Sequence, residues 1–173
     1  MSDGERTFLV DGEAVVAEAT PASLRLDPPA PISLEAAEEA ATRHVRFGGE
    51  EFSECFTCGV RTDALCIHAG QVTGSDLHAA PWTAMEVVPE VVWAAIDCPG
   101  AYAVGGPGRG EVVLGRMTAE IRRVPEEGEH CIVLAWPLGG EGRKLHAGTA
   151  LYSAAGELLA LARQTWIAPR DET

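Results

Sequence analysis

The sequence has few positive charges, few aromatic residues and no long apolar run. Thirteen lysines and arginines stand against 26 aspartates and glutamates, which gives the 173-residue chain a formal net charge of −13. Residues 1–54 hold twelve of the acidic residues and only four arginines. A domain that binds nucleic acid needs a basic face to neutralise phosphates. The composition therefore excludes nucleic acid as a partner.

No apolar run reaches the roughly 18 residues that a membrane-spanning helix requires, and the polar N-terminus has no signal-peptide pattern. We therefore expect no membrane partner and a cytoplasmic location. The five cysteines are an odd number without a secretory context, which fits reduced thiols better than a disulfide framework. The chain length fits one domain or one unit of an oligomer.

Residues 89–104, PEVVWAAIDCPGAYAV, form the stretch around which the chain is organised. They are apolar and rich in small side chains, which predicts one long helix buried on nearly every side. Pro89 suits a first helical turn, and Glu90 suits the positive end of the helix dipole. Pro99 is expected to kink the helix, close to the charged residue Asp97.

Runs of strand-forming residues flank this helix. Two are expected before it and four after it, with turn signals between them and a glycine-rich break at 105–110. The predicted strands lie within 64–72, 80–88, 111–124, 129–138, 144–153 and 156–167. One buried helix with a run of antiparallel strands predicts an α+β fold in which the sheet wraps around the helix.

The first 31 residues are expected to form a strand pair and a linker. Asp11-Gly12 is a turn signal that predicts a hairpin within residues 8–26. The sequence DPPAP at 27–31 fits neither a helix nor a central strand, so it predicts a linker. Ser33 then suits the N-cap of a surface helix that is acidic on one side and alanine-rich on the other.

Three segments, taken in their order and spacing, resemble the hot-dog-fold acyl-CoA thioesterase superfamily. They are ECFTCGV at 54–60, AAIDCPGAYA at 94–103 and GTALYSAAGELLALARQTWI at 148–167. The resemblance implies a curved antiparallel sheet wrapped around one long central helix and a homo-oligomer, dimer or higher. It also implies an acyl thioester as substrate, with coenzyme A as the favoured carrier, and we expect no cofactor.

The resemblance divides the chain into residues 1–31 and a hot-dog domain at 32–173 that begins with the surface helix. Some members of the superfamily carry two hot-dog repeats, and residues 11–26 resemble residues 155–169. The N-terminal strand pair is then the remnant of a first repeat, either in a shortened chain or in one whose start lies downstream of the original. The rival explanation is a chance likeness between alanine-rich strands.

The resemblance implies thioester hydrolysis with Asp97 as general base or nucleophile. Backbone donors for the oxyanion would come from the helix start, at Glu90 and Val91, on a partner subunit. Many relatives have His-Gly-Gly at that start, whereas this chain has Val88-Pro89-Glu90, and a proline supplies no N–H. The alternative function is therefore non-catalytic binding of an acyl chain or another small hydrophobic ligand. Asp97 has an alternative too, which is to bind backbone N–H groups freed at the kink.

Two further groups of residues are candidates for ligands. Arg143 and Lys144 follow a glycine-rich turn and either contact a nucleotide phosphate or lie in solvent. A zinc site is also conceivable in the pattern C-x2-C-x7-C-x-H, which comprises Cys55, Cys58, Cys66 and His68. The last two lie on one face of a predicted strand, and the resemblance accounts for the CFTCG segment without a metal. We therefore expect no metal at these four residues. Cys98 has no histidine placed by the sequence to activate it as a nucleophile.

Overall fold

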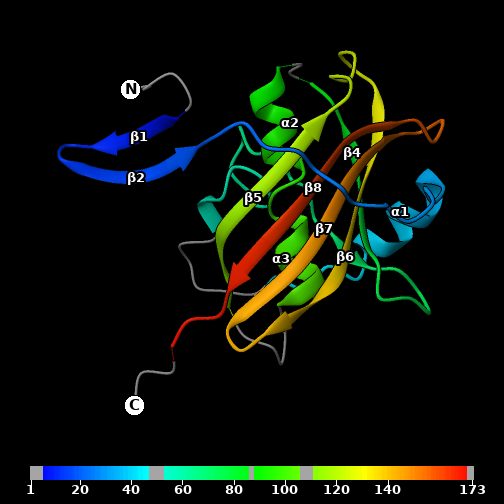
Figure 1. Cartoon of the computed structure of the whole chain (residues 1–173). Coiled ribbons are helices and arrows are strands. Elements are labelled where there is room, and N and C mark those ends of the chain that lie inside the picture. Colours follow the sequence, from blue (N-terminus) through cyan, green and yellow to red (C-terminus); the bar gives the residue numbers. More distant parts are fainter. Residues whose placement is uncertain (1–5, 47–52, 86–87, 106–110, 171–173) are drawn as a thin grey trace.

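The computed structural model of the chain describes residues 6–46, 53–85, 88–105 and 111–170. Its main sheet has six antiparallel strands in the order β3-β4-β6-β7-β8-β5. The strands are β3 (Gly70–Gln71), β4 (His78–Thr83), β5 (Val113–Ile121), β6 (His130–Glu141), β7 (Lys144–Ser153) and β8 (Leu158–Ile167). The sheet curves around the short helices α2 (Pro89–Ala95) and α3 (Pro99–Val104) (Figure 1). The predicted α+β class with an antiparallel sheet is confirmed.

The four strands that were predicted after the helix are all present, but the first predicted strand is not. Within residues 64–72 only Gly70 and Gln71 are in a strand. Cys66 has a φ of 53°, in the left-handed region, and such a residue interrupts an extended strand. Part of the next predicted strand, residues 86–87, lies outside the described residues, as do residues 106–110 of the predicted glycine-rich break.

The predicted long central helix is two short helices, α2 and α3, separated by a turn at residues 96–98. Pro99 has no N–H to donate to the Ala95 carbonyl, and it occupies the first turn of α3 instead. The expected kink is therefore a complete break. Ile96 is fully buried as predicted, whereas 42% of Trp93 is exposed in the single chain. Most of residues 91–103 are buried, as predicted. The burial of Trp93 was expected in the biological assembly and stays a prediction.

The sheet supplies the hydrogen bonds that hold this break. The Thr149 hydroxyl donates to the carbonyl of Ile96 over 2.7 Å. The Gln164 side-chain amide donates to the carbonyls of Ile96 and Asp97 over 2.8 and 2.9 Å. Trp166 Nε1 donates in turn to the Gln164 side-chain oxygen over 2.8 Å. Thr149 and Gln164 are fully buried, so these bonds form in the apolar core between the sheet and the helices.

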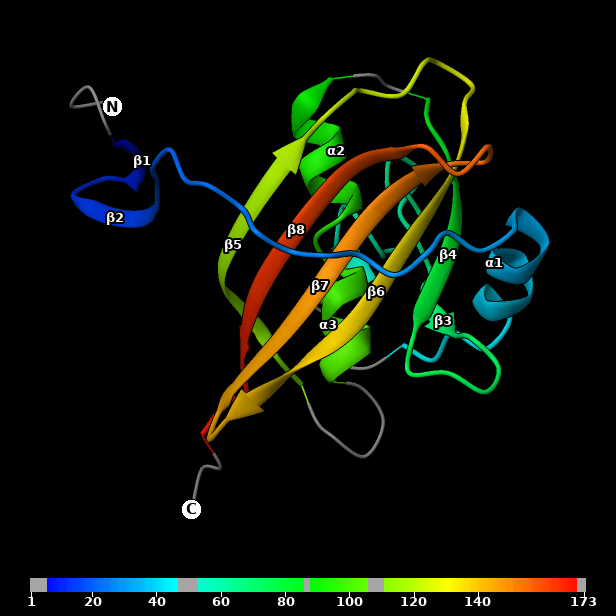
Figure 2. The ribbon, with the colours of Figure 1, turned by 45° about the vertical axis from the view of Figure 1, so that its right-hand side comes forward.

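Both faces of the sheet are covered. The inner face packs against α2, and the outer face packs against α1 (Leu34–Ala41), which buries Ala37 and Ala40 (Figure 2). The predicted N-cap is confirmed, because the Ser33 hydroxyl accepts a hydrogen bond from the N–H of Ala36 over 3.2 Å. Because both faces of the sheet are covered, residues 131–136 of β6 are all buried, and their sequence is a continuous apolar run.

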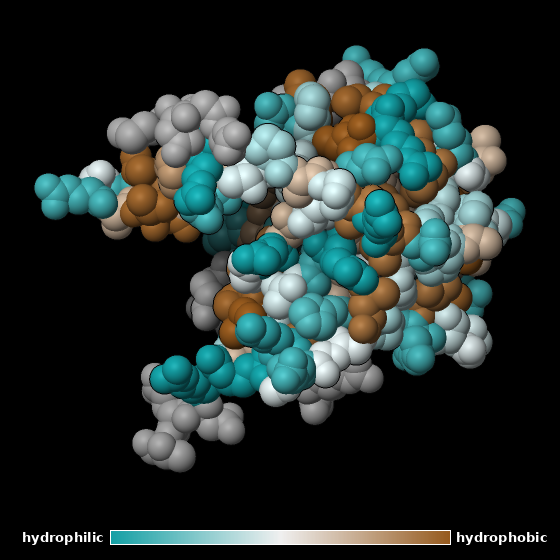
Figure 3. Space-filling model, viewed as in Figure 1, coloured by the Kyte–Doolittle hydropathy of each residue, from teal (hydrophilic) through white to brown (hydrophobic). Residues whose placement is uncertain are grey.

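The predicted N-terminal hairpin is confirmed as β1 (Thr7–Asp11) and β2 (Ala14–Ala19), which form a two-stranded sheet of their own. It projects from the main body (Figure 1), and apolar side chains gather on it (Figure 3). They include Leu9, Val10, Val15 and Val16, all of which are exposed. Among the helices that the structure describes, none has the length and the apolar character that a membrane crossing requires.

Residues 20–33 run from the hairpin across the outer face of the sheet to α1 (Figures 1 and 2). We call this segment the strap. Leu24, Leu26 and Ile32 of the strap pack against the outer core, and the Tyr152 hydroxyl donates to the carbonyl of Pro29 over 2.6 Å. The predicted linker is therefore packed against the body of the protein. We propose that only residues 1–19 are separable from the rest.

A truncation series tests this boundary. A chain that starts at residue 20 should keep the melting temperature of the full chain, because β2 is exposed along its whole length. A chain that starts at residue 32 loses Leu24, Leu26 and the bond to Tyr152. The lost burial should lower its free energy of unfolding by roughly 1 kcal/mol for each partly buried leucine. Its melting temperature should therefore fall by about 4 °C or more. Equal melting temperatures for the two truncated chains would show that the strap adds no stability.

Replacement of Gln164 tests the hydrogen bonds at the helix break. Gln164→Leu removes one of the two hydrogen bonds that each of the carbonyls of Ile96 and Asp97 accepts, and it leaves the buried Trp166 N–H without its partner. The free energy of unfolding should therefore fall by about 2 kcal/mol or more. Thermal and urea denaturation would measure the loss. The matched control is Gln71→Leu, because Gln71 is an exposed glutamine of β3. An equally small effect at both positions would contradict the assigned role of Gln164.

Candidate functional site at the helix break

Asp97 lies in the turn between α2 and α3, with its side chain half-buried. Its Oδ1 atom is buried and accepts no hydrogen bond from the residues that the structure describes. Burial raises the pKa of Asp97 to about 6, and negative charge at Cys55 adds to the shift. Thr149 and Gln164 bind the carbonyls of the turn, and the N–H groups of Asp97, Gly100 and Ala101 donate to main-chain carbonyls.

Three thiols gather beside Asp97. Cys55 and Cys58 belong to the loop that precedes β3, and Cys98 belongs to the turn between the helices. Their three sulfur atoms lie within 4.8 Å of one another, and the Sγ atoms of Cys55 and Cys98 are 3.3 Å apart. Hydrogen bonds with Cys58 and Cys98 lower the pKa of Cys55, and hydrogen bonds with Cys55 and Cys58 raise the pKa of Cys98. The cluster therefore favours a thiolate at Cys55.

The four residues weighed as zinc ligands in the sequence do not come together. The loop places Cys66 on the surface, and the ring of His68 stacks on that of His44 at a centroid distance of 4.8 Å. The strand that would have set Cys66 and His68 on one face is absent. Cys98 gathers with Cys55 and Cys58 instead. The sequence spacing gave no sign of this, because 43 residues separate Cys55 from Cys98.

A group of aromatic side chains adjoins the thiols. His44 packs against Tyr102 at a centroid distance of 4.6 Å, and its Nδ1 lies 3.0 Å from the carbonyl oxygen of Ala69. Burial lowers the pKa of His44, which favours the neutral ring. Tyr102 also forms a hydrogen bond with Cys58. No local motif surrounds His44 in the sequence, because its neighbours come from a loop and from α3.

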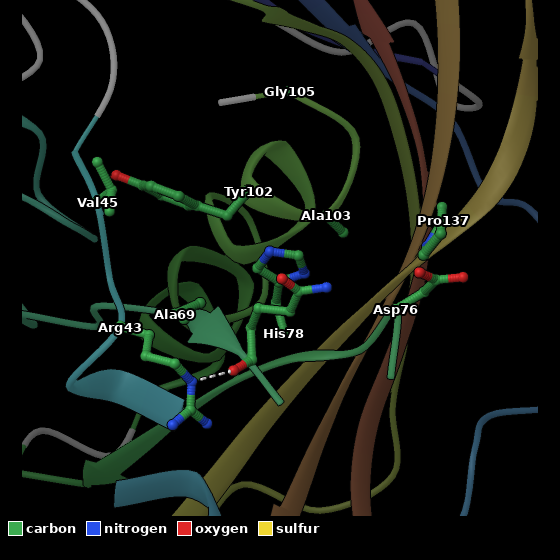
Figure 4. A pocket seen from close by; sticks show the side chains of 11 residues that line it. Arg43, Val45, Ala69, Asp76, His78, Tyr102, Ala103, Gly105 and Pro137 are labelled. Carbon is green, nitrogen blue, oxygen red and sulfur yellow. Dashed lines mark hydrogen bonds between the residues drawn. The ribbon is translucent and has the colours of Figure 1, made fainter. Parts of the chain in front are cut away.

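A cavity of about 430 Å³ opens on the other side of Tyr102 (Figure 4). Its walls combine charged and apolar side chains from the end of α1, from β3 and β4, and from α3, among them Arg43, Asp76, His78, Tyr102 and Pro137. Arg43 is held there by a hydrogen bond to the carbonyl of Gln71. Asp97 is not among the lining residues, so this cavity does not present a substrate to that carboxylate.

The predicted oxyanion donors lie at the start of α2. The N–H of Val91 already donates to the carbonyl of Val88 over 3.1 Å. The N–H of Glu90 has no acceptor among the described residues, so it is the better donor of the two. Seven residues separate Glu90 from Asp97, which corresponds to about 10 Å along a helix. One reacting carbonyl cannot contact both groups of a single chain.

Arg143 and Lys144 lie at the tip of the hairpin between β6 and β7, at the opposite end of the sheet from the start of α2 (Figures 1 and 2). The Arg143 guanidinium donates to the carbonyl of Ala168 over 3.0 Å, and both residues are exposed. Within one chain the structure therefore does not bring these cations together with Glu90 and Val91.

An antiparallel sheet wrapped around central helices is the arrangement of the hot-dog fold, and comparison with solved structures agrees. The chain is similar to zebrafish thioesterase superfamily member 2, with 15% identity and a TM-score of 0.56 over 69% of this chain and 95% of that chain. It is also similar to a second thioesterase superfamily protein, with 12% identity and a TM-score of 0.54 over 61% of this chain. The match spans only 55% of that second protein.

An uncharacterized protein from Pyrococcus horikoshii is similar as well, with 15% identity and a TM-score of 0.52 over 62% of this chain and 85% of that chain. Compared by sequence, the chain matches no protein-family model and no curated protein. At these identities the likeness shows the fold alone. The chain thus has the fold of thioesterase superfamily proteins, and the predicted resemblance is confirmed at that level.

Proposed function

We propose that the protein hydrolyses an acyl thioester, with acyl-CoA as the favoured substrate. The observation that carries the proposal is the position of Asp97 at the break of the central helix. One oxygen of its carboxylate is buried and accepts no hydrogen bond from a described residue. The fold, which is shared with thioesterase superfamily proteins, gives it further support. An acyl-CoA substrate also agrees with the cytoplasmic location expected from the sequence.

In the proposed reaction Asp97 acts as general base. It takes a proton from a water molecule as the water oxygen attacks the thioester carbonyl, and the negative charge moves to the carbonyl oxygen. The carbon–sulfur bond then breaks, and the proton leaves with the thiol. In the nucleophilic variant the carboxylate itself attacks the carbonyl carbon, the carbon–sulfur bond breaks and the thiolate leaves. Water then hydrolyses the resulting anhydride, which releases the acid and restores the Asp97 carboxylate, and the thiolate takes up a proton from that water.

The carbonyl oxygen needs a donor, and we propose the N–H of Glu90 of a partner subunit for this role. The separation between the start of α2 and the turn that carries Asp97 favours the Glu90 of the partner over that of the same chain. A homodimer with two equivalent sites satisfies this requirement. Arg143 and Lys144 remain proposed contacts for the phosphates of the coenzyme A moiety, since both are exposed cations.

One observation favours the alternative function, which is binding of an acyl chain or another small hydrophobic ligand without catalysis. Pro89 is the first residue of α2 and has no N–H. The helix start therefore offers fewer donors to an oxyanion than a start with glycines would. Direct binding of acyl-CoA without turnover by the wild-type protein would decide for this alternative.

Replacement of the carboxylate tests the role of Asp97. Asp97→Asn keeps the volume of the side chain and removes the base, so turnover of the best acyl-CoA should fall by about 10²-fold or more. Free coenzyme A should be quantified by chromatography, because a thiol reagent also reacts with the free cysteines of the protein. The matched control is Asp11→Asn, which changes an exposed aspartate of the hairpin.

Full activity in a folded Asp97→Asn protein would remove this residue from the mechanism. The two forms of the mechanism are separated by a single turnover of the wild-type protein in water labelled with ¹⁸O. Label in the Asp97 carboxylate shows that this group attacked the carbonyl carbon, because water that opens the anhydride at the Asp97 carbonyl leaves its oxygen on the side chain. Trapping of an acyl group on Asp97 covers the other case, in which water opens the anhydride at the acyl carbonyl.

Mixed dimers test whether the donor belongs to the partner. Glu90→Pro removes the proposed donor N–H at a position in the first helical turn, where proline is tolerated, and should abolish activity. Glu90→Ala keeps the N–H and should keep activity. A heterodimer of Asp97→Asn and Glu90→Pro chains, purified with two tags, has one intact site and should recover about half of the wild-type activity.

The control heterodimer pairs an Asp97→Asn chain with a chain that carries both substitutions. It has no intact site and should stay inactive. If Asp97 and Glu90 of the same chain served one site, both heterodimers would be inactive, and the proposed sharing of the site would be wrong. A monomeric mass in light scattering would lead to the same conclusion.

A further inference from the structure

We propose that Cys55, Cys58 and Cys98 bind a zinc ion as three thiolates, with a water molecule as the fourth ligand. The proposal goes beyond thioester hydrolysis and does not depend on it. It rests on the convergence of three of the five cysteines from two segments that are far apart in the sequence. The other two, Cys66 and Cys131, are not members of the cluster.

The distances suit tetrahedral zinc. Zinc–sulfur bonds of about 2.3 Å at tetrahedral angles separate the sulfur atoms by about 3.8 Å. The Sγ atoms of Cys55 and Cys98 are 3.3 Å apart, and no pair in the cluster exceeds 4.8 Å. The required separation lies between these values. Small movements of the side chains therefore bring the three sulfur atoms into position around one ion.

The loop that carries Cys55 and Cys58 is held in the shape that the site needs. The N–H of Gly59 donates to the carbonyl of Cys55 over 2.8 Å, which closes a tight turn and places the two thiols on one side. A side chain at Gly59 would collide with that carbonyl. The Thr57 hydroxyl donates to the carbonyl of Ala94 over 2.9 Å and fixes the turn to the end of α2.

The chemistry of the donors selects the ion. Thiolates are soft ligands that prefer zinc to magnesium or calcium, and the C-x2-C spacing of Cys55 and Cys58 is common in zinc sites. Binding releases the thiol protons, and the zinc ion takes their place between the sulfur atoms. Cys55 and Cys98 are partly exposed, whereas Cys58 is buried. Water therefore has access to the fourth position from the side of Cys55 and Cys98.

The ion would tie the loop to the break of the central helix. Cys98 follows Asp97 directly, so the metal would fix the turn from the side opposite to Gln164. We infer a stabilising role, in which the bound ion reduces the unfolding of this region. Because an ion that binds only the folded chain stabilises it by mass action, zinc should raise the melting temperature of the reduced, chelator-treated protein.

Cobalt titration tests the site directly, because thiolate–cobalt(II) coordination gives strong charge-transfer absorbance. The full-length protein should be reduced, freed of metal with a chelator and titrated with Co²⁺ without oxygen. The absorbance should saturate at about one ion per chain, and Zn²⁺ should abolish it. Cys55→Ser and Cys98→Ser should lose most of the signal and the rise in melting temperature with Zn²⁺. The matched controls Cys66→Ser and Cys131→Ser should keep both.

Three outcomes would overturn the proposal. The first is the absence of the cobalt signal in the reduced wild-type protein at excess Co²⁺. The second is a signal that survives Cys98→Ser but is lost in Cys66→Ser, which would assign the metal to another set of residues. The third is a disulfide between Cys55 and Cys98 in a protein that takes up no metal after reduction. Circular dichroism shows whether each variant is folded. If either Cys55→Ser or Cys98→Ser does not fold, the other still tests the site.

Discussion

The hydrogen bonds that Gln164 donates to the broken central helix are the constraint on which the rest of the structure depends. Pro99 ends the run of helical hydrogen bonds, and the carbonyls of Ile96 and Asp97 are left facing an apolar core. Gln164 is fully buried and donates to both, while Trp166 holds its side-chain oxygen. The Thr149 hydroxyl adds a second bond to the Ile96 carbonyl, and the Gly100 N–H adds one to the Asp97 carbonyl. A buried carbonyl without a partner is costly. This polar group in the sheet therefore makes the break possible and fixes its position.

The same constraint shapes the chain around it. Gly100 has no side chain, and a Cβ at that position would overlap the Gln164 amide. Only a glycine lets α3 approach the sheet this closely. With the carbonyls of the turn held from the sheet, Cys98 is presented to the loop that carries Cys55 and Cys58. The break thus sets the surroundings of both proposed sites, the carboxylate and the thiol cluster.

Sequence patterns predicted the elements with local signals and missed the contacts between distant ones. The strands from Val113 to Ile167 have clear runs and turns, and Ser33 marks the start of α1. Pro99 signalled a disturbance but not a full break. The missed clue was Gln164, a polar residue inside an otherwise apolar strand, since such a residue needs a buried partner. Spacing favoured Cys66 as a companion of Cys55, because nothing local reveals that Cys98 folds back onto that loop.

The exposure of Trp93 bears on how two chains could complete a site. Trp93 follows Glu90 by three residues on α2, so the two lie on neighbouring parts of the same helix surface. A partner that brings a substrate carbonyl to the Glu90 N–H must approach this surface, and it would then cover the indole that is exposed in the single chain. The outer face of the sheet is already covered by α1 and the strap. The burial of Trp93 that was expected in the biological assembly is therefore what the proposed dimer requires.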